Sequence, residues 1–113
     1  MDCIFCRIVA GQVPADIIYQ DEQIVAFRDI NPVAPVHVLV IPRKHIPSLA
    51  SLSQADFAII GDMVKVANEL ARREGIAEKG YRLVMNSGKE GGQLVPHLHM
   101  HLLGGRRLGN GLG

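Results

Sequence analysis

Three of the chain's five histidines, His97, His99 and His101, alternate with apolar residues in the run HLHMHLL near the C-terminus. Successive side chains of a β-strand point to opposite faces, so a strand here would place the three imidazoles together and Leu98, Met100 and Leu102 on the other face. An unprotonated imidazole, available near neutral pH, is both a nucleophile and a metal ligand. A solvated strand face is the ordinary alternative, but three histidines at this strict spacing predict a chemical site.

A three-histidine metal centre is one interpretation of this triplet. Alternate residues of a strand lie about 6.6 Å apart, which separates His97 from His101 by about 13 Å, whereas zinc holds each nitrogen at about 2.1 Å. Two neighbouring histidines could share an ion, but all three could do so only in a distorted strand. We therefore expect a division of labour, with His97 in one site and His99 and His101 in another.

The two cysteines, Cys3 and Cys6, form a C-x-x-C pair near the N-terminus. A thioredoxin-like motif would follow a strand, and only two residues precede this pair. We expect the chain to be cytoplasmic, where a structural disulfide is disfavoured. Zinc binding is the favoured interpretation, and a pair of free reduced thiols is the alternative.

A glycine-rich run, NSGKEGG at residues 86–92, comes shortly before the histidines. Residues 88–93 could turn several backbone N–H groups toward one point and bind an anion, for which phosphate is the natural guest. The P-loop pattern is absent, and an ordinary connection between strands would explain the glycines equally well. The position of the run directly before the histidines favours a phosphate site.

Hydrophobic patterning predicts the elements that must position these residues. A short helical turn is expected at 4–9, and one long helix is expected to begin at Ser53, with Asp56 in its first turn, and to end at Gly75. Runs rich in β-branched and aromatic residues predict five strands, at 17–20, 24–28, 37–41, 81–85 and 97–103. This order predicts an α+β fold, in which an antiparallel sheet of about five strands is combined with one long helix and a short N-terminal helix.

Composition restricts the function classes. A chain of 113 residues can form one domain, 1–113, with a core of its own. Its 12 basic and 11 acidic residues give a net charge of +1 and no basic stripe, so polymeric nucleic acid is not an expected partner. No apolar run approaches the roughly 20 residues that cross a bilayer, and the acid at position 2 does not suit a secretory signal. We expect a cytoplasmic protein without a membrane segment.

These motifs together resemble the histidine triad (HIT) family, in particular its Hint branch of nucleoside phosphoramidases. The resemblance rests on DINP at 29–32, PVHVLVIPRKH at 35–45, Asn86, and GGQLVPHLHMHLLGGR at 91–106. It implies a HIT-like fold, a homodimeric assembly in the family's manner, and hydrolysis of the P–N bond of adenosine 5'-phosphoramidates. A dinucleoside polyphosphate hydrolase of the related Fhit branch is the alternative enzyme, and a nucleotide-sensing or scaffolding module is the alternative without catalysis.

The resemblance also implies roles for the histidines. His99 would be the nucleophile that forms a nucleotidyl-histidine intermediate, His37 would belong to an orienting and proton-relay network, and His101 would contact the phosphate. An amine leaves poorly unless it is protonated, so a general acid is required in this cluster. The sequence does not say which residue provides that proton.

The remaining site residues are likewise implied by the resemblance to the HIT family, for an AMP-like purine nucleotide. Asp29 would bind the ribose hydroxyls. The phosphate would be bound by Asn86, Gly92, Gln93, Leu94 and Val95. The purine would lie in an apolar slot of Phe5, Ile8, Phe27, Ile30 and Leu39. Bacterial relatives imply a structural zinc held by Cys3, Cys6, His45 and His97, and no cofactor is implied for catalysis itself.

Overall fold

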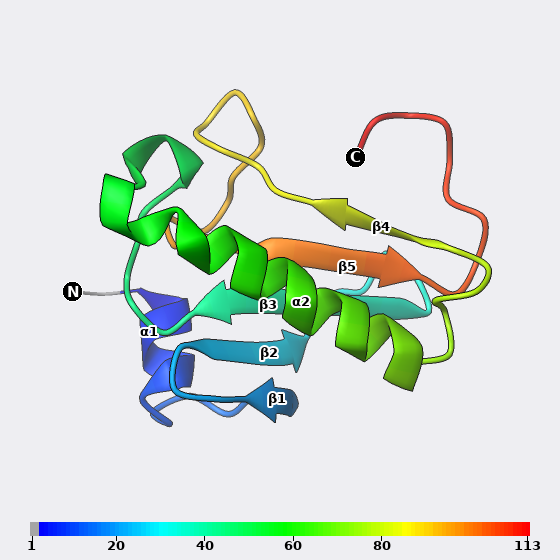
Figure 1. Cartoon of the computed structure of the whole chain (residues 1–113), viewed down its shortest axis with the longest axis horizontal. Coiled ribbons are helices and arrows are strands. Elements are labelled where there is room, and N and C mark those ends of the chain that lie inside the picture. Colours follow the sequence, from blue (N-terminus) through cyan, green and yellow to red (C-terminus); the bar gives the residue numbers. More distant parts are fainter. Residues whose placement is uncertain (1–2) are drawn as a thin grey trace.

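The computed structural model describes residues 3–113, and within that range five strands form one open antiparallel sheet (Figure 1). The strands are β1 (Ile17–Gln20), β2 (Ile24–Arg28), β3 (Val36–Pro42), β4 (Tyr81–Val84) and β5 (Met100–Gly104), in the order β1-β2-β3-β5-β4. The helices are the short α1 (Ile4–Val9) and the long α2 (Ala58–Arg73). The predicted α+β fold class, with its sheet and two helices, is confirmed.

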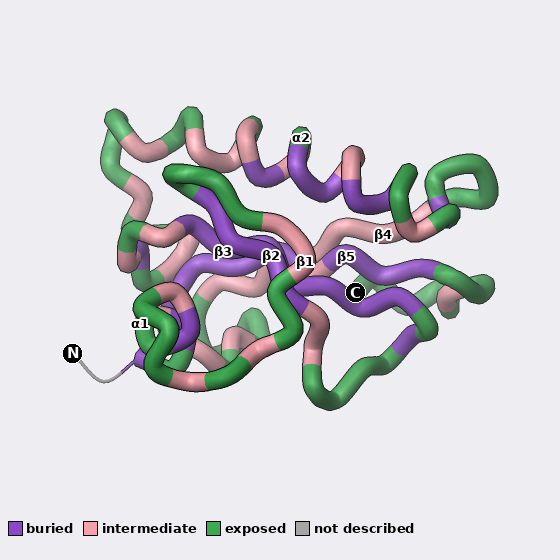
Figure 2. Tube along the Cα trace, turned by 90° about the horizontal axis from the view of Figure 1, so that it is seen from below, coloured by how far each residue is buried: buried purple, intermediate pink, exposed green. Residues whose placement is uncertain are grey.

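The two helices pack on opposite faces of the sheet, which lies between them as a largely buried layer (Figure 2). Strand alternation explains the two cores. In β3, Val36, Val38 and Val40 pack with α2, whereas Leu39 and Ile41 pack with α1. The histidines project on the α1 side of the sheet, so the larger core beneath α2 carries no part of the chemistry.

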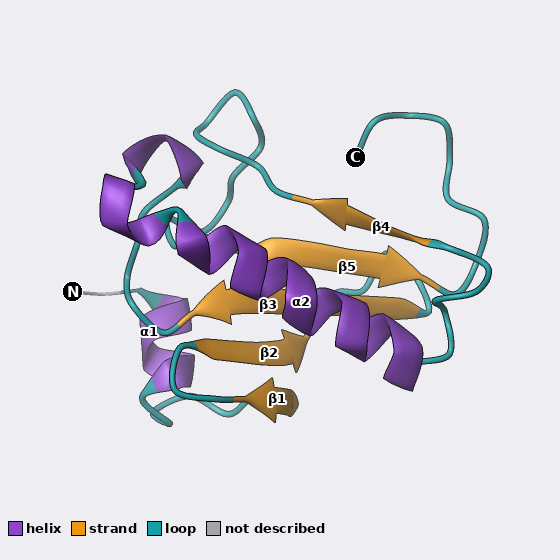
Figure 3. Ribbon diagram, in the orientation of Figure 1, coloured by secondary structure: helices purple, strands orange, loops and turns teal. Residues whose placement is uncertain are grey.

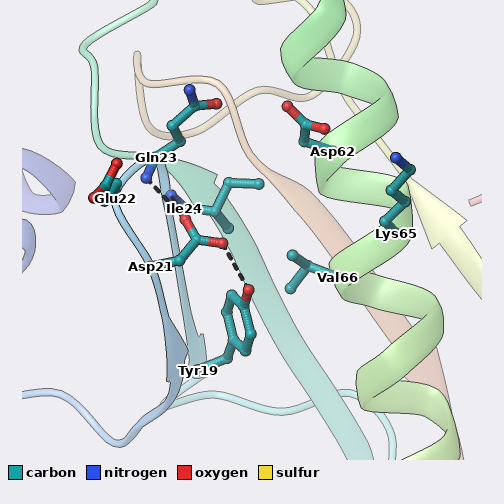
Figure 4. A pocket seen from close by; sticks show the side chains of 8 residues that line it. All are labelled: Tyr19, Asp21, Glu22, Gln23, Ile24, Asp62, Lys65 and Val66. Carbon is teal, nitrogen blue, oxygen red and sulfur yellow. Dashed lines mark hydrogen bonds between the residues drawn. The ribbon is translucent and has the colours of Figure 1, made fainter.

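The turn between β1 and β2 is built around Asp21, as the polar residues there predict. Its Oδ1 accepts the N–H groups of Gln23 and Ile24, both at 2.8 Å, and its Oδ2 accepts the Tyr19 hydroxyl at 2.6 Å. A hollow of about 420 Å³ separates this turn from α2 (Figure 4). It opens on the α2 side of the sheet and is therefore separate from the histidines.

The start of α2 differs from the prediction at Ser53. A 3₁₀ turn occupies Gln54–Asp56, and the α-helix begins at Ala58. The Ser53 hydroxyl donates to the Asp56 carboxylate at 2.9 Å instead of accepting a helix N–H, and Lys44 also binds that carboxylate. Ser53 and Asp56, the two expected capping side chains, thus bind each other and Lys44 and do not cap α2.

The histidine strand is also shorter than predicted. It begins at Met100, and the long connection from β4 is irregular up to that point (Figure 3). The N–H of Leu98 bonds to the Ile46 carbonyl at 2.7 Å, outside the sheet ladder. The predicted alternation nevertheless persists, because Leu98, Met100 and Leu102 all lie in the core beneath α2.

None of the helices among residues 3–113 is long and apolar enough to cross a membrane.

Alanine substitutions at two glycines should change the free energy of unfolding in opposite directions. Gly61 is exposed within α2, and a Cβ there would meet no atom within 4 Å. Gly61→Ala should therefore raise the free energy of unfolding by about 0.5–1 kcal/mol, through helix propensity. A Cβ on Gly91 would lie 2.5 Å from the Ser87 carbonyl oxygen, so Gly91→Ala should lower that free energy by about 1–3 kcal/mol. Urea unfolding measures both, and equal effects would contradict this placement of the glycine loop.

Candidate active site and metal cluster

The structure places four of the chain's five histidines in two clusters, and the fifth, His99, lies between them. Within each cluster the candidate ligand atoms lie within 4.8 Å of one another. The metal cluster consists of Cys3, Cys6, His45 and His97, and the relay cluster consists of Asp29, His37 and His101. His97 and His101 thus lie in different clusters, as the strand spacing predicts.

Three segments of the chain contribute to the metal cluster. Cys3 precedes α1 and Cys6 lies within it, whereas His45 follows β3 and His97 precedes β5. His97 Nδ1 lies 3.4 Å and 3.5 Å from the two sulfurs, and His45 Nδ1 lies 3.2 Å from the Cys6 sulfur. The cluster therefore attaches the N-terminal helix to one end of the sheet, where β3 ends and β5 begins.

The donor chemistry of the metal cluster fits zinc. His97 Nε2 lies 2.8 Å from the Pro42 carbonyl oxygen, which can only accept, so the proton is on Nε2 and Nδ1 presents a lone pair to the sulfurs. Burial lowers the pKa of His97, which keeps this ring unprotonated. Burial and the neighbouring Cys3 raise the pKa of the Cys6 thiol, a cost that a bound cation offsets by stabilising the thiolate. Two thiolates and two neutral imidazoles form a tetrahedral Cys2His2 donor set.

The relay cluster is assembled by the pairing of β3 with β5. Leu39 lies opposite His101, and His37 lies opposite Leu103, so the two histidines are diagonal neighbours on one face. Their nearest ring nitrogens, His37 Nε2 and His101 Nδ1, are 3.0 Å apart. Asp29 Oδ2 lies 3.4 Å from the same His37 nitrogen.

A main-chain group sets the protonation pattern of this cluster. The N–H of Val33 donates to His37 Nδ1 at 3.1 Å, so the proton of the neutral His37 ring must be on Nε2. That N–H donates to His101 Nδ1, which leaves the proton of His101 on its own Nε2. His101 can therefore donate a hydrogen bond from Nε2 to a substrate.

Burial keeps both rings of the relay neutral. It lowers the pKa of His37, even though the Asp29 carboxylate opposes this effect. Burial, together with the nearby His99 and His37, lowers the pKa of His101 to about 4. Neutral rings can pass a proton along a hydrogen-bonded chain, because each has one donor and one acceptor nitrogen.

The same protonation pattern makes the relay cluster a poor metal site, although its residue types are those of metal ligands. An ion on His37 Nε2 would displace the ring proton to Nδ1. The Val33 N–H already points at that nitrogen, so two hydrogens would face each other. The tautomers thus distinguish a metal cluster from a proton relay.

His99 lies between the clusters in the form that a nucleophile requires. Its Nδ1–H donates to the His97 carbonyl at 2.7 Å, so the lone pair is on Nε2. The His101 ring lies 5.1 Å away, and the Phe5 ring packs edge-on at 5.2 Å, both measured between centroids. A largely buried ring with these neighbours has little freedom to turn.

The glycine loop differs from the predicted phosphate nest. The N–H of Gly88 donates to Gln93 Oε1, and the N–H groups of Gly92 and Gln93 donate to loop carbonyls. These three donors close the loop on itself and are not available to the predicted nest, which stays a prediction for the rest of the loop. Among residues 3–113, the backbone N–H groups of Leu94 and Val95 have no intramolecular partner and are free to bind a phosphate.

The side chains expected to bind phosphate hold the loop in this structure. Gln93 Nε2 donates to the carbonyls of Pro47 and Val95, at 2.7 and 2.9 Å, which uses both of its N–H bonds. Asn86 donates to the Gly91 carbonyl at 2.8 Å and retains one free N–H. Leu94 is 93% exposed, which leaves its main chain as its means of contacting phosphate.

Four of the five residues expected in the purine slot come together. Phe5, Ile8, Phe27 and Leu39 belong to one buried cluster beneath α1, on the histidine side of the sheet. Ile30 does not join them, because it is 89% exposed in the loop after β2. In the same loop, Asp29 is partly buried and faces His37.

Residues 10–108 match the family model of the HIT domain. The chain belongs to the HIT family. It is 51% identical over 108 residues to the purine nucleoside phosphoramidase of Escherichia coli K12, a match that covers 96% of this chain and 91% of that protein. The fold is similar to a HIT family hydrolase from Legionella pneumophila, with a TM-score of 0.96, 45% identity, and coverage of 99% and 100% of the two chains. It is also similar to a zinc-bound histidine triad family protein from Mycobacterium smegmatis, with a TM-score of 0.81, 34% identity, and coverage of 100% and 81%.

Sequence reasoning missed the main-chain groups of this HIT site. The Val33 N–H and the carbonyls of Pro42 and His97 select the tautomers of three histidines. No side-chain pattern marks them, because every residue carries the same main-chain donor and acceptor. The proline-punctuated loop around Val33 was the one available signal that the main chain there has an unusual course.

The relay makes a prediction for His101 in the free HIT protein. Its ring should stay neutral, with the proton on Nε2, as the pH falls from about 8 to about 5, because its pKa is lowered to about 4. Long-range nitrogen–proton NMR distinguishes the two ring nitrogens. A His37→Phe variant, which lacks the donor to Nδ1, should show both tautomers. A doubly protonated His101 at about pH 6 in the unaltered protein would contradict the relay.

Proposed function

We propose that this HIT protein is a purine nucleoside phosphoramidase that cleaves the P–N bond of adenosine 5'-phosphoramidates through a covalent nucleotidyl-His99 intermediate. The observation that carries the proposal is the complementary pair of tautomers, a lone pair on His99 Nε2 and a proton on His101 Nε2. The 51% identity to the phosphoramidase of Escherichia coli supports the same substrate class.

In the first step, the His99 lone pair attacks the phosphorus of the phosphoramidate. A bond from His99 Nε2 to phosphorus forms, and the P–N bond breaks. The developing negative charge on the phosphoryl oxygens is stabilised by the free N–H groups of Leu94 and Val95 and by donation from the relay. The leaving nitrogen takes a proton and departs as an amine.

We assign that proton to His101. In the free protein the ring is neutral, but an anionic phosphate beside it favours the protonated form and raises its pKa. The ligand atoms of Asp29, His37 and His101 lie within 4.8 Å of one another, so the negative charge of the Asp29 carboxylate stabilises a positive charge on His101. In the second step, water attacks phosphorus, His99 leaves with its lone pair restored, and the proton of water returns to the relay.

Substrate binding follows from the same face of the sheet. The carboxylate of Asp29 can accept hydrogen bonds from both ribose hydroxyls, because each of its oxygens can accept more than one. Its Oδ1 accepts the Asn31 N–H, and its Oδ2 lies 3.4 Å from His37 Nε2. The purine would pack against the cluster that contains Phe5 and Phe27, with Ile30 at its solvent edge. Asn86 keeps one free N–H for the phosphate.

We further propose that residues 1–113 form a single domain, that the metal cluster holds a structural zinc, and that the protein is a homodimer. The cluster's Cys2His2 donor set and the zinc-bound relative support the metal. Strand β4 supports the dimer, because within residues 3–113 it lies at one of the two edges of the sheet with β5 on one side, so a second copy could extend the sheet on the other side. The cytoplasmic location stays a prediction from the sequence.

The proposed reaction is tested by trapping the intermediate. Rapid quenching during turnover of an adenosine phosphoramidate should yield one AMP per chain, on the peptide that contains His99. His99→Ala should lower kcat by on the order of a thousandfold or more, because the attacking atom is lost. Lys65→Ala, on the exposed side of α2, is the matched folding control. Faster turnover of a diadenosine polyphosphate would favour the Fhit-type reaction instead, and an active His99→Ala protein would exclude the covalent route.

Metal removal tests the zinc site. Protein purified without added metal should contain about one zinc per chain. Chelation should lower the free energy of unfolding by about 3 kcal/mol, relative to protein with free zinc a hundredfold above its Kd. Cys6→Ser should abolish that difference. Metal-free protein of unchanged thermal stability would contradict a structural zinc.

A further inference from the structure

His97 belongs to the metal cluster and also contacts the nucleophile. Its ring presents Nδ1 to the two sulfurs, and its Nε2–H donates to the Pro42 carbonyl at 2.8 Å. Its own carbonyl accepts the Nδ1–H of His99 at 2.7 Å. The side chain is fully buried, at 0% exposure, so the ring and the carbonyl cannot move independently of their surroundings. A shift of His97 would therefore displace the acceptor that selects the tautomer of His99.

Phe5 provides a second link between the metal cluster and the nucleophile. It lies in α1 between the two cysteines, and its ring packs edge-on against both His97, at 5.8 Å, and His99, at 5.2 Å. A helix of only six residues is not stable by itself, so the position of α1 depends on its attachments. Those attachments are apolar packing on the sheet and the cysteine ligands at its start.

Thiol hydrogen bonds alone would hold these groups weakly, because sulfur is a poor donor and acceptor. An ion bonded to all four side chains would replace them with strong and directional bonds. The ligands come from three segments: the start of α1, the turn after β3 and the loop before β5. Binding would thus fix α1 and the loop containing His97 relative to each other.

We propose that the metal cluster positions the nucleophile. An ion there fixes the His97 carbonyl and the Phe5 ring, and these two groups hold the His99 imidazole in its attacking tautomer and orientation. His97 and Phe5 are positioning residues in this scheme. The inference rests on the proposed zinc site and on His99 as the nucleophile, and it gives the ion a part in catalysis beyond stabilising the fold.

The first test observes His99 directly, without turnover. In the zinc-loaded protein the Nδ1–H of His99 should give a sharp NMR signal that exchanges slowly with water. Chelation should accelerate that exchange by about tenfold or more, while the backbone amides of β3 remain protected and report an intact fold. An Nδ1–H signal that is indifferent to the ion in a folded protein would overturn the inference.

The second test leaves the metal in place, which covers the case in which chelated protein unfolds. Phe5→Leu keeps an apolar side chain but removes the aromatic edge. The zinc-loaded variant should keep about one zinc per chain, show faster exchange of the His99 Nδ1–H, and lose about tenfold in kcat, a size typical of outer-shell changes. Val9→Ala is the matched control, because Val9 lies in the same helix and packs on the same apolar cluster. A rise in KM with unchanged kcat would make Phe5 only a wall of the purine slot and would overturn its positioning role.

Combining chelation with Phe5→Leu shows whether the ion and Phe5 act on kcat through the same ring or independently. If the ion and Phe5 act on the same ring, the effects of chelation and of Phe5→Leu on kcat should not multiply. Multiplicative effects would overturn the shared mechanism. A protein that binds no zinc would overturn both this inference and the proposed metal site, whereas a protein that binds zinc and keeps an unchanged His99 signal would overturn the inference alone. Failure to cleave phosphoramidates would contradict the proposed function and leave the NMR result to decide the positioning.

Discussion

The hydrogen bond from the Nδ1–H of His99 to the His97 carbonyl is the interaction on which the site depends. A proton on Nδ1 leaves the lone pair on Nε2, so this bond determines which nitrogen is available for the proposed attack on phosphorus. The surrounding contacts hold that carbonyl in place. The N–H of His97 donates to the Val95 carbonyl, and its ring donates to the Pro42 carbonyl at the end of β3.

In the relay cluster, too, a main-chain group selects the tautomers of the histidines. A main-chain N–H, that of Val33, fixes His37, and His37 fixes His101 through the diagonal contact between β3 and β5. Burial lowers the pKa of both rings, which favours their neutral forms in the free protein. Main-chain groups thus select the tautomers of His99, the proposed nucleophile, and of His101, its proposed proton donor.

Local sequence patterns predicted the helices and strands well where one physical effect, such as strand alternation, determined the structure. Strand alternation correctly placed Leu98, Met100 and Leu102 on the core side, although the strand itself starts only at Met100. Prediction failed where side chains had competing partners. Ser53 and Asp56 bind each other instead of capping α2, and Gln93 accepts from the Gly88 N–H, which withdraws a main-chain donor from the predicted phosphate nest.

The sequence by itself determined the residue types, their alternation between two faces and the separation of His97 from His101 into different sites, because side-chain direction in an extended chain is a local property. The resemblance to HIT proteins added the expected roles. Only the tertiary structure decided the tautomers, the edge-on placement of Phe5 and the choice between a metal cluster and a relay. Those depend on carbonyls and N–H groups brought from distant segments, and main-chain groups are the same in every sequence.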